Sequence, residues 1–173
     1  MAALLHNRGR ILALDRSAKK INLVEDNCKR LGVSNVRTVC ADARTWNPSF
    51  LADRVLVDAP CSGLGVLGKR SDLRWNKTPG DLPQLQGIQV ELLNAAAAAL
   101  KPGGCLVYST CTIVREENED TVSRFLSAHS EFSAVRPGAG FAEELITAEG
   151  FLRTWPHRHG IAGGFAAKLR KSN

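Results

Sequence analysis

The sequence predicts an α/β fold of the doubly wound, Rossmann-like class, with a mostly parallel sheet and helices on both faces. Short apolar runs that end in an acidic residue recur at Arg10–Asp15, Val36–Asp42 and Arg54–Asp58. Stretches with the apolar spacing of amphipathic helices alternate with such runs, which is typical of parallel strands joined by helical crossovers. Ligands of these folds bind beyond the carboxyl ends of the strands, so the terminal acids are candidate site residues.

The first crossover helix is predicted from Ser17, which can cap it, to Gly32, which can end it. Its apolar residues share one face, and they are Ile21, Val24, Cys28 and Leu31. The later predicted elements are strands at Val36–Cys40 and Arg54–Asp58, a loop from Pro60 to about Asp81, a helix over Leu82–Leu100 stopped by Pro102–Gly104, a strand at Cys105–Ser109, a helix whose first turns hold Glu116, Glu117, Glu119 and Asp120, and strands near Phe132–Val135 and Gly164–Leu169.

Composition is consistent with one domain over residues 1–173, because 44% hydrophobic content suffices for one core. The oligomeric state is left open by the sequence, and a monomer is the expected state. The net charge of +6 is compatible with an RNA partner, although many proteins without a nucleic-acid role share such a charge. Five cysteines without a CxxC pair, and no apolar run of membrane length, predict no disulfide scaffold, no metal site and no membrane partner. We expect a reducing intracellular compartment, the cytoplasm in preference to an organelle.

Three acids are candidate ligands of a nucleoside cofactor. Asp15 is placed to accept hydrogen bonds from ribose hydroxyls, and Asp42 is placed to contact an adenine edge. The alternative for both residues is an acid that closes a strand or caps the next helix. Asp58 ends the strand before the Pro60-Cys61 turn, where it would border any site at that edge of the sheet.

Two cysteines are predicted to share one pocket. Cys61 follows the strand that ends at Asp58, and Cys111 follows the strand that ends at Ser109. One helical crossover joins these strands, so we expect them to be neighbours, about 4.8 Å apart, with both thiols at one edge. The helix after Cys111 would also favour its thiolate through the helix dipole. The alternative is that both are ordinary buried cysteines in structural loops.

Two thiols and a carboxylate beside a nucleoside site suit methylation of carbon 5 of cytosine. A thiolate that attacks carbon 6 makes carbon 5 nucleophilic, and a sulfonium donor can then supply a methyl group. An acid near ring nitrogen 3 stabilises the adduct, and a base must remove the carbon-5 proton before the first cysteine can leave. The second thiol is a candidate to help in that release.

The sequence resembles the RsmB-like, or Sun, family of RNA cytosine-C5 methyltransferases, whose bacterial members modify small-subunit ribosomal RNA. The matching segments cover most of the chain, and they are Asp53–Gly63, Arg70–Trp75, Lys101–Gly104, Ser109–Thr112 and Glu116–Glu119. The resemblance implies S-adenosylmethionine as cofactor and RNA, ribosomal RNA first, as the substrate.

The resemblance also implies roles for individual residues. Cys111 matches the nucleophile, Cys61 matches the cysteine of product release, and Asp58 matches a residue at the cofactor and the target base. Asp15 and Asp42 match the ribose and adenine contacts. A segment that could meet the RNA holds Arg70, Arg74 and Trp75, with Trp75 available for stacking, and an ordinary surface loop is an equal alternative there.

The chain departs from the family pattern in three places. The glycine-rich cofactor loop is absent, so Met1 resembles an internal methionine of a longer protein or the start of a truncated product. Ala52 replaces the usual apolar residue before Asp53, and Ala162 and Gly164 stand where an Asp and a Phe are usual. Without the family's first strand, the strands ending at Asp15 and Asp58 lose a shared neighbour, so we expect weak cofactor binding by this chain alone.

Two other functions are compatible with parts of this sequence pattern. A non-catalytic RNA-binding or scaffold protein would keep the fold's surface without the cofactor loop. A thiol-redox or cysteine-hydrolase protein is a weaker alternative, because the sequence has neither a CxxC pair nor a well-placed histidine base.

Overall fold

The computed structural model describes residues 1–76, 78 and 80–173, and these form two compact units, residues 1–47 and residues 48–173. Lys77 and Pro79, within the loop expected over Pro60–Asp81, lie outside the described residues. Each unit is described by itself, and the single methyltransferase domain over residues 1–173 stays a prediction. No helix in the described part of the chain is long and apolar enough to cross a bilayer.

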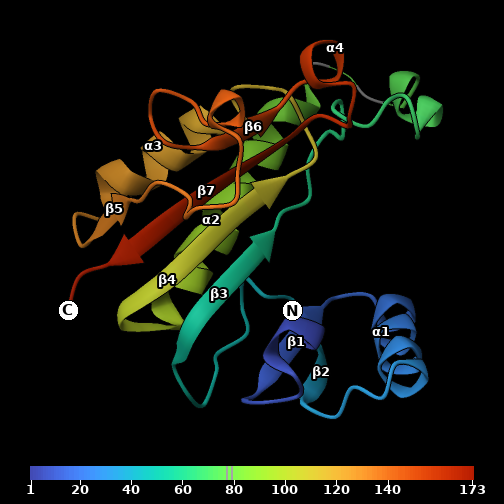
Figure 1. Cartoon of the computed structure of the whole chain (residues 1–173), viewed down its shortest axis with the longest axis vertical. Helices are drawn as coiled ribbons and strands as arrows, with labels where there is room; N and C mark the ends of the chain where they lie inside the picture. The colour runs from blue at the N-terminus through green and yellow to red at the C-terminus, as the bar shows by residue number, and fades with distance from the viewer. Residues whose placement is uncertain (77, 79) are drawn as a thin grey trace. The chain divides into compact units, whose positions relative to one another are not determined.

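The first unit is a β-α-β element in which two parallel strands are joined by a helix (Figure 1). Its elements are a 3-10 helix η1 (Ala3–Leu5), β1 (Ile11–Asp15), α1 (Ala18–Arg30) and β2 (Val36–Cys40). The strand register pairs Asp15 with Cys40, so both strands end at the same edge. The predicted strands and helix are thereby confirmed.

The cap of α1 differs in detail from the prediction. Ser17 occupies the N-cap position, but its hydroxyl makes no capping hydrogen bond. Its backbone N–H instead donates to Oδ1 of Asp15 over 2.8 Å, so the acid orders the turn into the helix. Gly32 follows the helix with a φ of +63°, the left-handed conformation that a glycine adopts without strain.

The second unit contains a five-stranded sheet with strand order β3-β4-β7-β5, and β6 pairs with β7 beside β5. Its elements are β3 (Ala52–Asp58), η2 (Ser71–Arg74), α2 (Asp81–Ala98), β4 (Leu100–Thr110), α3 (Glu119–Ala128), β5 (Phe132–Ala134), η3 (Glu143–Leu145), β6 (Leu152–Thr154), α4 (Pro156–His159) and β7 (Gly164–Lys171). β3 runs parallel to β4, and β7 runs antiparallel to β4, β5 and β6. The α/β order predicted from the sequence is confirmed.

The core lies between this sheet and the helices α2 and α3, which cover the same face of it (Figure 1). Alternate residues of β4 and β7 point into the core, and the register places Leu106 opposite Leu169 and Tyr108 opposite Ala167. These four side chains are fully buried. The period of two therefore positions the next residues of β4, Ser109 and Thr110, on opposite faces at the edge where the strand ends.

Several element boundaries differ from the sequence prediction. Helix α2 ends at Ala98, and Leu100 begins β4 because its side chain is fully buried in the core. The glycines that were expected to stop the helix lie within β4, where Gly103 has a φ of +68°. Helix α3 begins only at Glu119, so Glu116 and Glu117 precede it. Strand β6 was not predicted, since three residues are too few to show a period.

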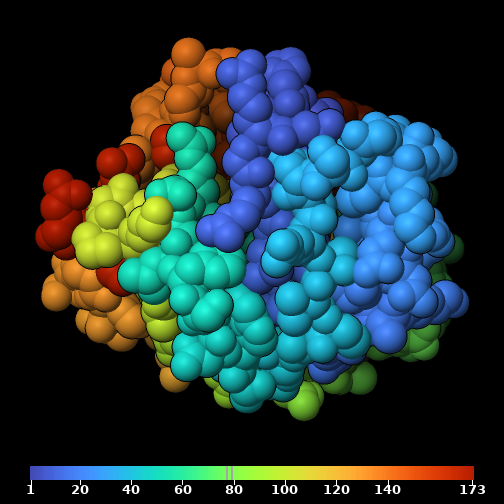
Figure 2. Space-filling model, turned by 90° about the horizontal axis from the view of Figure 1, so that it is seen from below, coloured from blue at the N-terminus to red at the C-terminus, as the bar shows by residue number. Residues whose placement is uncertain are grey.

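Strands β1 and β3 each have an edge without a partner strand in the described part of the chain, as predicted. β1 pairs only with β2, and β3 pairs only with β4. The surface view shows residues around β3, coloured teal, exposed on one side of their unit (Figure 2). By their accessible surface, Leu51 before β3 and Leu56 within it are 45% and 49% exposed, which is high for leucines.

Candidate active site

The candidate site lies where β3 and β4 leave the sheet at the same edge. The parallel register pairs Asp58 with Ser109, and the N–H of Ala59 donates to the Ser109 carbonyl over 2.9 Å. The chain then turns so that Sγ of Cys61 lies 3.4 Å from Sγ of Cys111. The predicted proximity of the two sulfur atoms is confirmed, and it follows from the single crossover between neighbouring parallel strands.

The two thiols have different surroundings. Cys61 is half-buried and Cys111 is exposed. The pKa of Cys61 is raised to about 12, chiefly by burial and in addition by the hydrogen bond and the charge interaction with Cys111. Cys61 therefore stays a thiol that can donate a hydrogen bond to the Cys111 sulfur, and the exposed Cys111 is the sulfur that an incoming molecule can reach.

The helix dipole does not act on Cys111 as the sequence suggested. Because α3 begins at Glu119, the segment Thr112–Asn118 separates Cys111 from the helix N-terminus. A macrodipole acts mainly within the first turn of its helix. The Cys111 sulfur therefore interacts with the neighbouring Cys61 thiol, 3.4 Å away, and not with the helix N-terminus.

Main-chain contacts fix the loop that carries Cys61. The N–H of Gly65 donates to the Cys111 carbonyl over 3.1 Å, and the N–H of Gly163 donates to the Gly65 carbonyl over 2.8 Å. A Cβ atom at Gly65 would lie 2.3 Å from the Gly163 carbonyl oxygen and 2.8 Å from that of Cys111. Only glycine allows three chain segments to approach this closely.

A buried polar cluster lies beneath the two cysteines. Glu117 is fully buried, and its carboxylate accepts hydrogen bonds from the N–H of Ser62 at 2.8 Å and from Nε2 of Gln89 at 3.0 Å. The hydroxyl of Ser62 lies 2.5 Å from the second carboxylate oxygen and 2.8 Å from Oγ1 of Thr112. The cluster joins the residue after Cys61 to the residue after Cys111.

Sequence reasoning missed the role of Glu117, since it was expected in an acidic first helical turn. Tyr108 packs beside this cluster, and its hydroxyl donates to the Glu117 carbonyl over 2.6 Å. Burial, followed by the charge of Glu117, raises the pKa of Tyr108 well above its usual range. One signal in the sequence was available: four acids around one asparagine exceed what an N-terminal helical turn uses.

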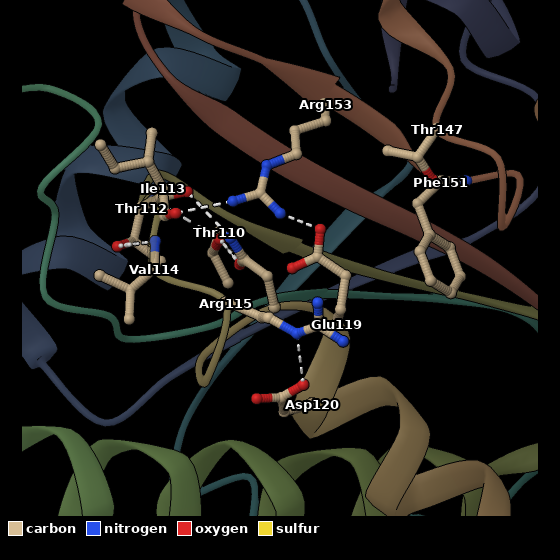
Figure 3. Close-up of polar contacts among 11 residues, drawn as sticks. Thr110, Thr112, Ile113, Val114, Arg115, Glu119, Asp120, Thr147, Phe151 and Arg153 are labelled. Atoms are coloured by element: carbon tan, nitrogen blue, oxygen red, sulfur yellow. Dashed lines mark hydrogen bonds and ion pairs between the residues drawn. The ribbon is translucent and has the colours of Figure 1, made fainter.

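Arg153 of β6 holds the segment after Cys111 from the other side (Figure 3). Its guanidinium donates to the Ile113 carbonyl over 2.7 Å and forms a buried ion pair with Glu119. It also lies over the Trp155 ring, 4.1 Å from the centroid. Burial lowers the pKa of Arg153, but an arginine remains charged at any physiological pH. This residue was not predicted, because β6 itself was not.

The three predicted acids are divided between the two units. In the first unit, Asp15 accepts from Ser17 and lies 3.3 Å from Nζ of Lys20, while Asp42 is bound by Arg44. Hydrogen bonds from Arg44 lower the pKa of Asp42 to about 2. Both acids lie at the edge where β1 and β2 end, so the nucleoside and the structural interpretations both stay open for them.

The residues of the second unit that were predicted to bind cofactor or RNA are exposed. The side chain of Asp58 has no hydrogen-bond or ion-pair partner within the described residues, so both of its oxygens can accept from a ligand. Arg70 pairs with Asp72 at 3.0 Å, and Arg74 ends the short helix η2. Trp75 is 82% exposed, which leaves its ring available for stacking on a base.

The family model described as 16S rRNA methyltransferase RsmB/F matches residues 1–170. Ribosomal RNA small subunit methyltransferase F of Erwinia tasmaniensis is 40% identical over 176 residues, which cover 99% of this chain and 37% of that protein. Probable ribosomal RNA small subunit methyltransferase B of Bacillus subtilis is 35% identical over 180 residues, which cover 99% of this chain and 40% of that protein. The chain thus spans about two fifths of the length of these relatives.

Two solved structures have the same fold over nearly the whole chain. NSun6 from Pyrococcus horikoshii, solved with SFG, is 36% identical with a TM-score of 0.88, and the match covers 99% of this chain and 44% of that one. A methyltransferase homolog protein from Pyrococcus horikoshii is 31% identical with a TM-score of 0.82, covering 98% and 56%. The predicted Rossmann-like fold is confirmed by these neighbours.

Proposed function

We propose that this chain, which belongs to the 16S rRNA methyltransferase RsmB/F family, methylates carbon 5 of cytosine in ribosomal RNA through a covalent adduct with Cys111. The observation that supports this chemistry is the 3.4 Å separation of the Cys61 and Cys111 sulfur atoms at the ends of two parallel strands.

In the proposed reaction, the Cys111 thiolate attacks carbon 6 of the cytosine, and a carbon–sulfur bond forms. The ring electrons move toward carbon 5, which becomes the nucleophile. S-adenosylmethionine supplies an electrophilic methyl group when it is bound. A base then removes the proton from carbon 5, the bond between carbon 6 and the Cys111 sulfur breaks, and the thiolate is regenerated.

The structure suggests how Cys61 takes part in the release. The charge on Cys111 helps to keep Cys61 protonated, and that charge disappears once the Cys111 sulfur is bonded to carbon 6. The pKa of Cys61 then falls, although burial still holds it above the usual value. Formation of the adduct therefore makes the Cys61 thiol easier to deprotonate at the stage where the reaction needs a base.

The cofactor roles are proposals carried by the acids at strand ends. Asp15 would accept from the ribose hydroxyls, Asp42 would meet the adenine edge, and Asp58 would lie near the target base. The fit is reasonable for Asp15, since Lys20 is an exposed residue that can move aside. Asp58 fits because both of its oxygens are open to a ligand.

The RNA partner is supported by charge and by exposed side chains. The chain carries a net charge of +6, which favours a polyanion. Arg70, Arg74 and Trp75 would provide phosphate contacts and a stacking surface. An rRNA substrate is consistent with the expected cytoplasmic location and also with an organelle that has its own ribosomes.

A trapping experiment tests this function. The test protein is a hybrid in which this chain replaces the matching segment of the Erwinia tasmaniensis relative, and the 173-residue chain alone is assayed in parallel. With S-adenosylmethionine and RNA that contains 5-fluorocytosine, we expect a covalent protein–RNA adduct, since fluorine cannot leave as the proton does. Cys111→Ala should abolish the adduct, and Cys105→Ala should not.

Two outcomes would overturn the proposal. Methyl transfer by Cys111→Ala at the parental rate would exclude the covalent mechanism. Tight RNA binding by a hybrid that holds the cofactor yet transfers no methyl group would favour the non-catalytic scaffold.

A further inference from the structure

Glu117 is a carboxylate buried without a cationic partner. It is 0% exposed, and within the described residues it takes part in no ion pair. Its partners are neutral donors: the N–H and the hydroxyl of Ser62, and the amide of Gln89. Burying a charge among neutral groups costs stability, and a neutral side chain of the same size would cost less. Fold stability therefore does not explain a carboxylate at this position.

The contacts of Glu117 give the Ser62–Thr112 link a direction. A carboxylate only accepts hydrogen bonds, so the Ser62 hydroxyl donates to Glu117 over 2.5 Å. The Ser62 oxygen is then left to accept from Thr112, whose Oγ1 lies 2.8 Å away. Ser62 and Thr112 directly follow the two cysteines, so this chain of hydrogen bonds ties the two cysteine loops together.

The loop of Cys61 is held on both of its sides. Glu117 binds the N–H of the following residue, Ser62, at 2.8 Å. Gln89 donates from the same Nε2 to the carbonyl of the preceding residue, Pro60, at 2.9 Å and to Glu117 at 3.0 Å. Glu117 thereby orients both the loop and the amide that clamps it.

We infer that Glu117 is a positioning residue that acts through Ser62 and Gln89 to hold Cys61 against Cys111. The inference rests on the proposed function, and it concerns one step of it. Loss of the carboxylate displaces Cys61 from the adduct and slows its release, while Cys111, which is held by β4 and by Arg153, still attacks the base. A variant of Glu117 therefore behaves like Cys61→Ala.

The test uses the hybrid protein with Glu117→Gln. An amide cannot accept from all three donors, because its NH₂ group faces one of them. We expect release to slow by about tenfold to a hundredfold, the usual effect of losing one hydrogen bond to a charged group. With ordinary cytosine RNA, an adduct absent from the parent should accumulate, as it should in Cys61→Ala.

The matched controls separate positioning from general damage. Glu116→Gln changes an exposed neighbouring acid and should release product at the parental rate. The reciprocal exchange Glu117→Gln with Gln89→Glu returns a carboxylate to the cluster and should restore part of the release. Formation of the 5-fluorocytosine adduct should be unchanged in Glu117→Gln, since that readout depends on Cys111.

The rate of product release in two variants decides whether Glu117 positions Cys61. If the parent traps 5-fluorocytosine RNA but Glu117→Gln releases ordinary product normally, the inference is wrong and the proposed function stands. If Glu117→Gln does not fold, Ser62→Ala replaces it, because that variant keeps the backbone bond to Glu117 and loses only the hydroxyl link. Release by Ser62→Ala at the parental rate would then overturn the inference.

Discussion

The two site thiols should react with an alkylating agent at very different rates. Cys61 has a pKa of about 12 against a reference value of 9.0. At pH 8 an ordinary thiol of that reference value is about one tenth thiolate, and Cys61 is about one part in ten thousand. Since only the thiolate attacks iodoacetamide, Cys61 should be modified about a thousandfold more slowly than an unperturbed cysteine.

The raised pKa of Cys61 also makes the free energy of unfolding depend on pH. Its contribution to stability is fully present below pH 9 and is lost as the pH rises from about 9 to about 12. Cys111→Ala removes the hydrogen bond and the charge interaction that Cys111 contributes to the raised pKa of Cys61. The burial of Cys61, which is the largest cause of that rise, remains. The pKa of Cys61 should then fall only in part, and its modification should accelerate.

The assay is a short pulse of iodoacetamide on the 173-residue chain, followed by mass spectrometry of the cysteine peptides. Exposed Cys40 serves as the internal reference. Modification of Cys61 as fast as Cys40 at pH 8 would refute the argument from burial. No acceleration of Cys61 in Cys111→Ala would show that the two sulfurs are not coupled.

Three further predictions follow from other parts of the structure. Arg153→Met should lower the free energy of unfolding in urea by about 3–5 kcal/mol, because it leaves the buried Glu119 carboxylate unpaired. As a control, Arg115→Met removes an exposed ion pair with Asp120 and should change that free energy by about 1 kcal/mol or less. Gly65→Ala should lower the free energy of unfolding by at least about 1–3 kcal/mol and separate the two thiols, since its Cβ would lie 2.3 Å from a carbonyl oxygen. As a control, Gly68→Ala should leave stability unchanged, because no atom lies within 4 Å of the added Cβ. The isolated chain should bind S-adenosylmethionine only weakly, because β1 and β3 each lack a partner strand on one edge in the described residues, and micromolar binding in titration calorimetry would contradict this.

The sequence predicted what depends on local pattern and on simple topology. The ends of β1, β2 and β3 follow from apolar runs that stop at or near an acid, and the proximity of Cys61 and Cys111 follows from a single helical crossover between neighbouring parallel strands. These features are robust because they need only the order of the elements and the spacing of parallel strands.

The side-chain contacts that hold the site in place could not be predicted from local pattern, because they join residues far apart in the chain. Glu117 meets Ser62 55 positions away, and Arg153 meets Ile113 40 positions away. Whether Glu117 lies in a helical turn or beneath the cysteines depends on a shift of two residues in the start of α3. Helix boundaries are rarely predicted to that precision, since propensity changes little between adjacent positions.

The main-chain hydrogen bonds at Gly65 and Gly163 link the loop of Cys61 to the segment of Cys111, in addition to the side-chain hydrogen bonds of Glu117. They run between amide and carbonyl groups, which every residue other than proline carries. This link is therefore independent of the surrounding side chains, except at positions 65 and 163, where even one added methyl group has no room.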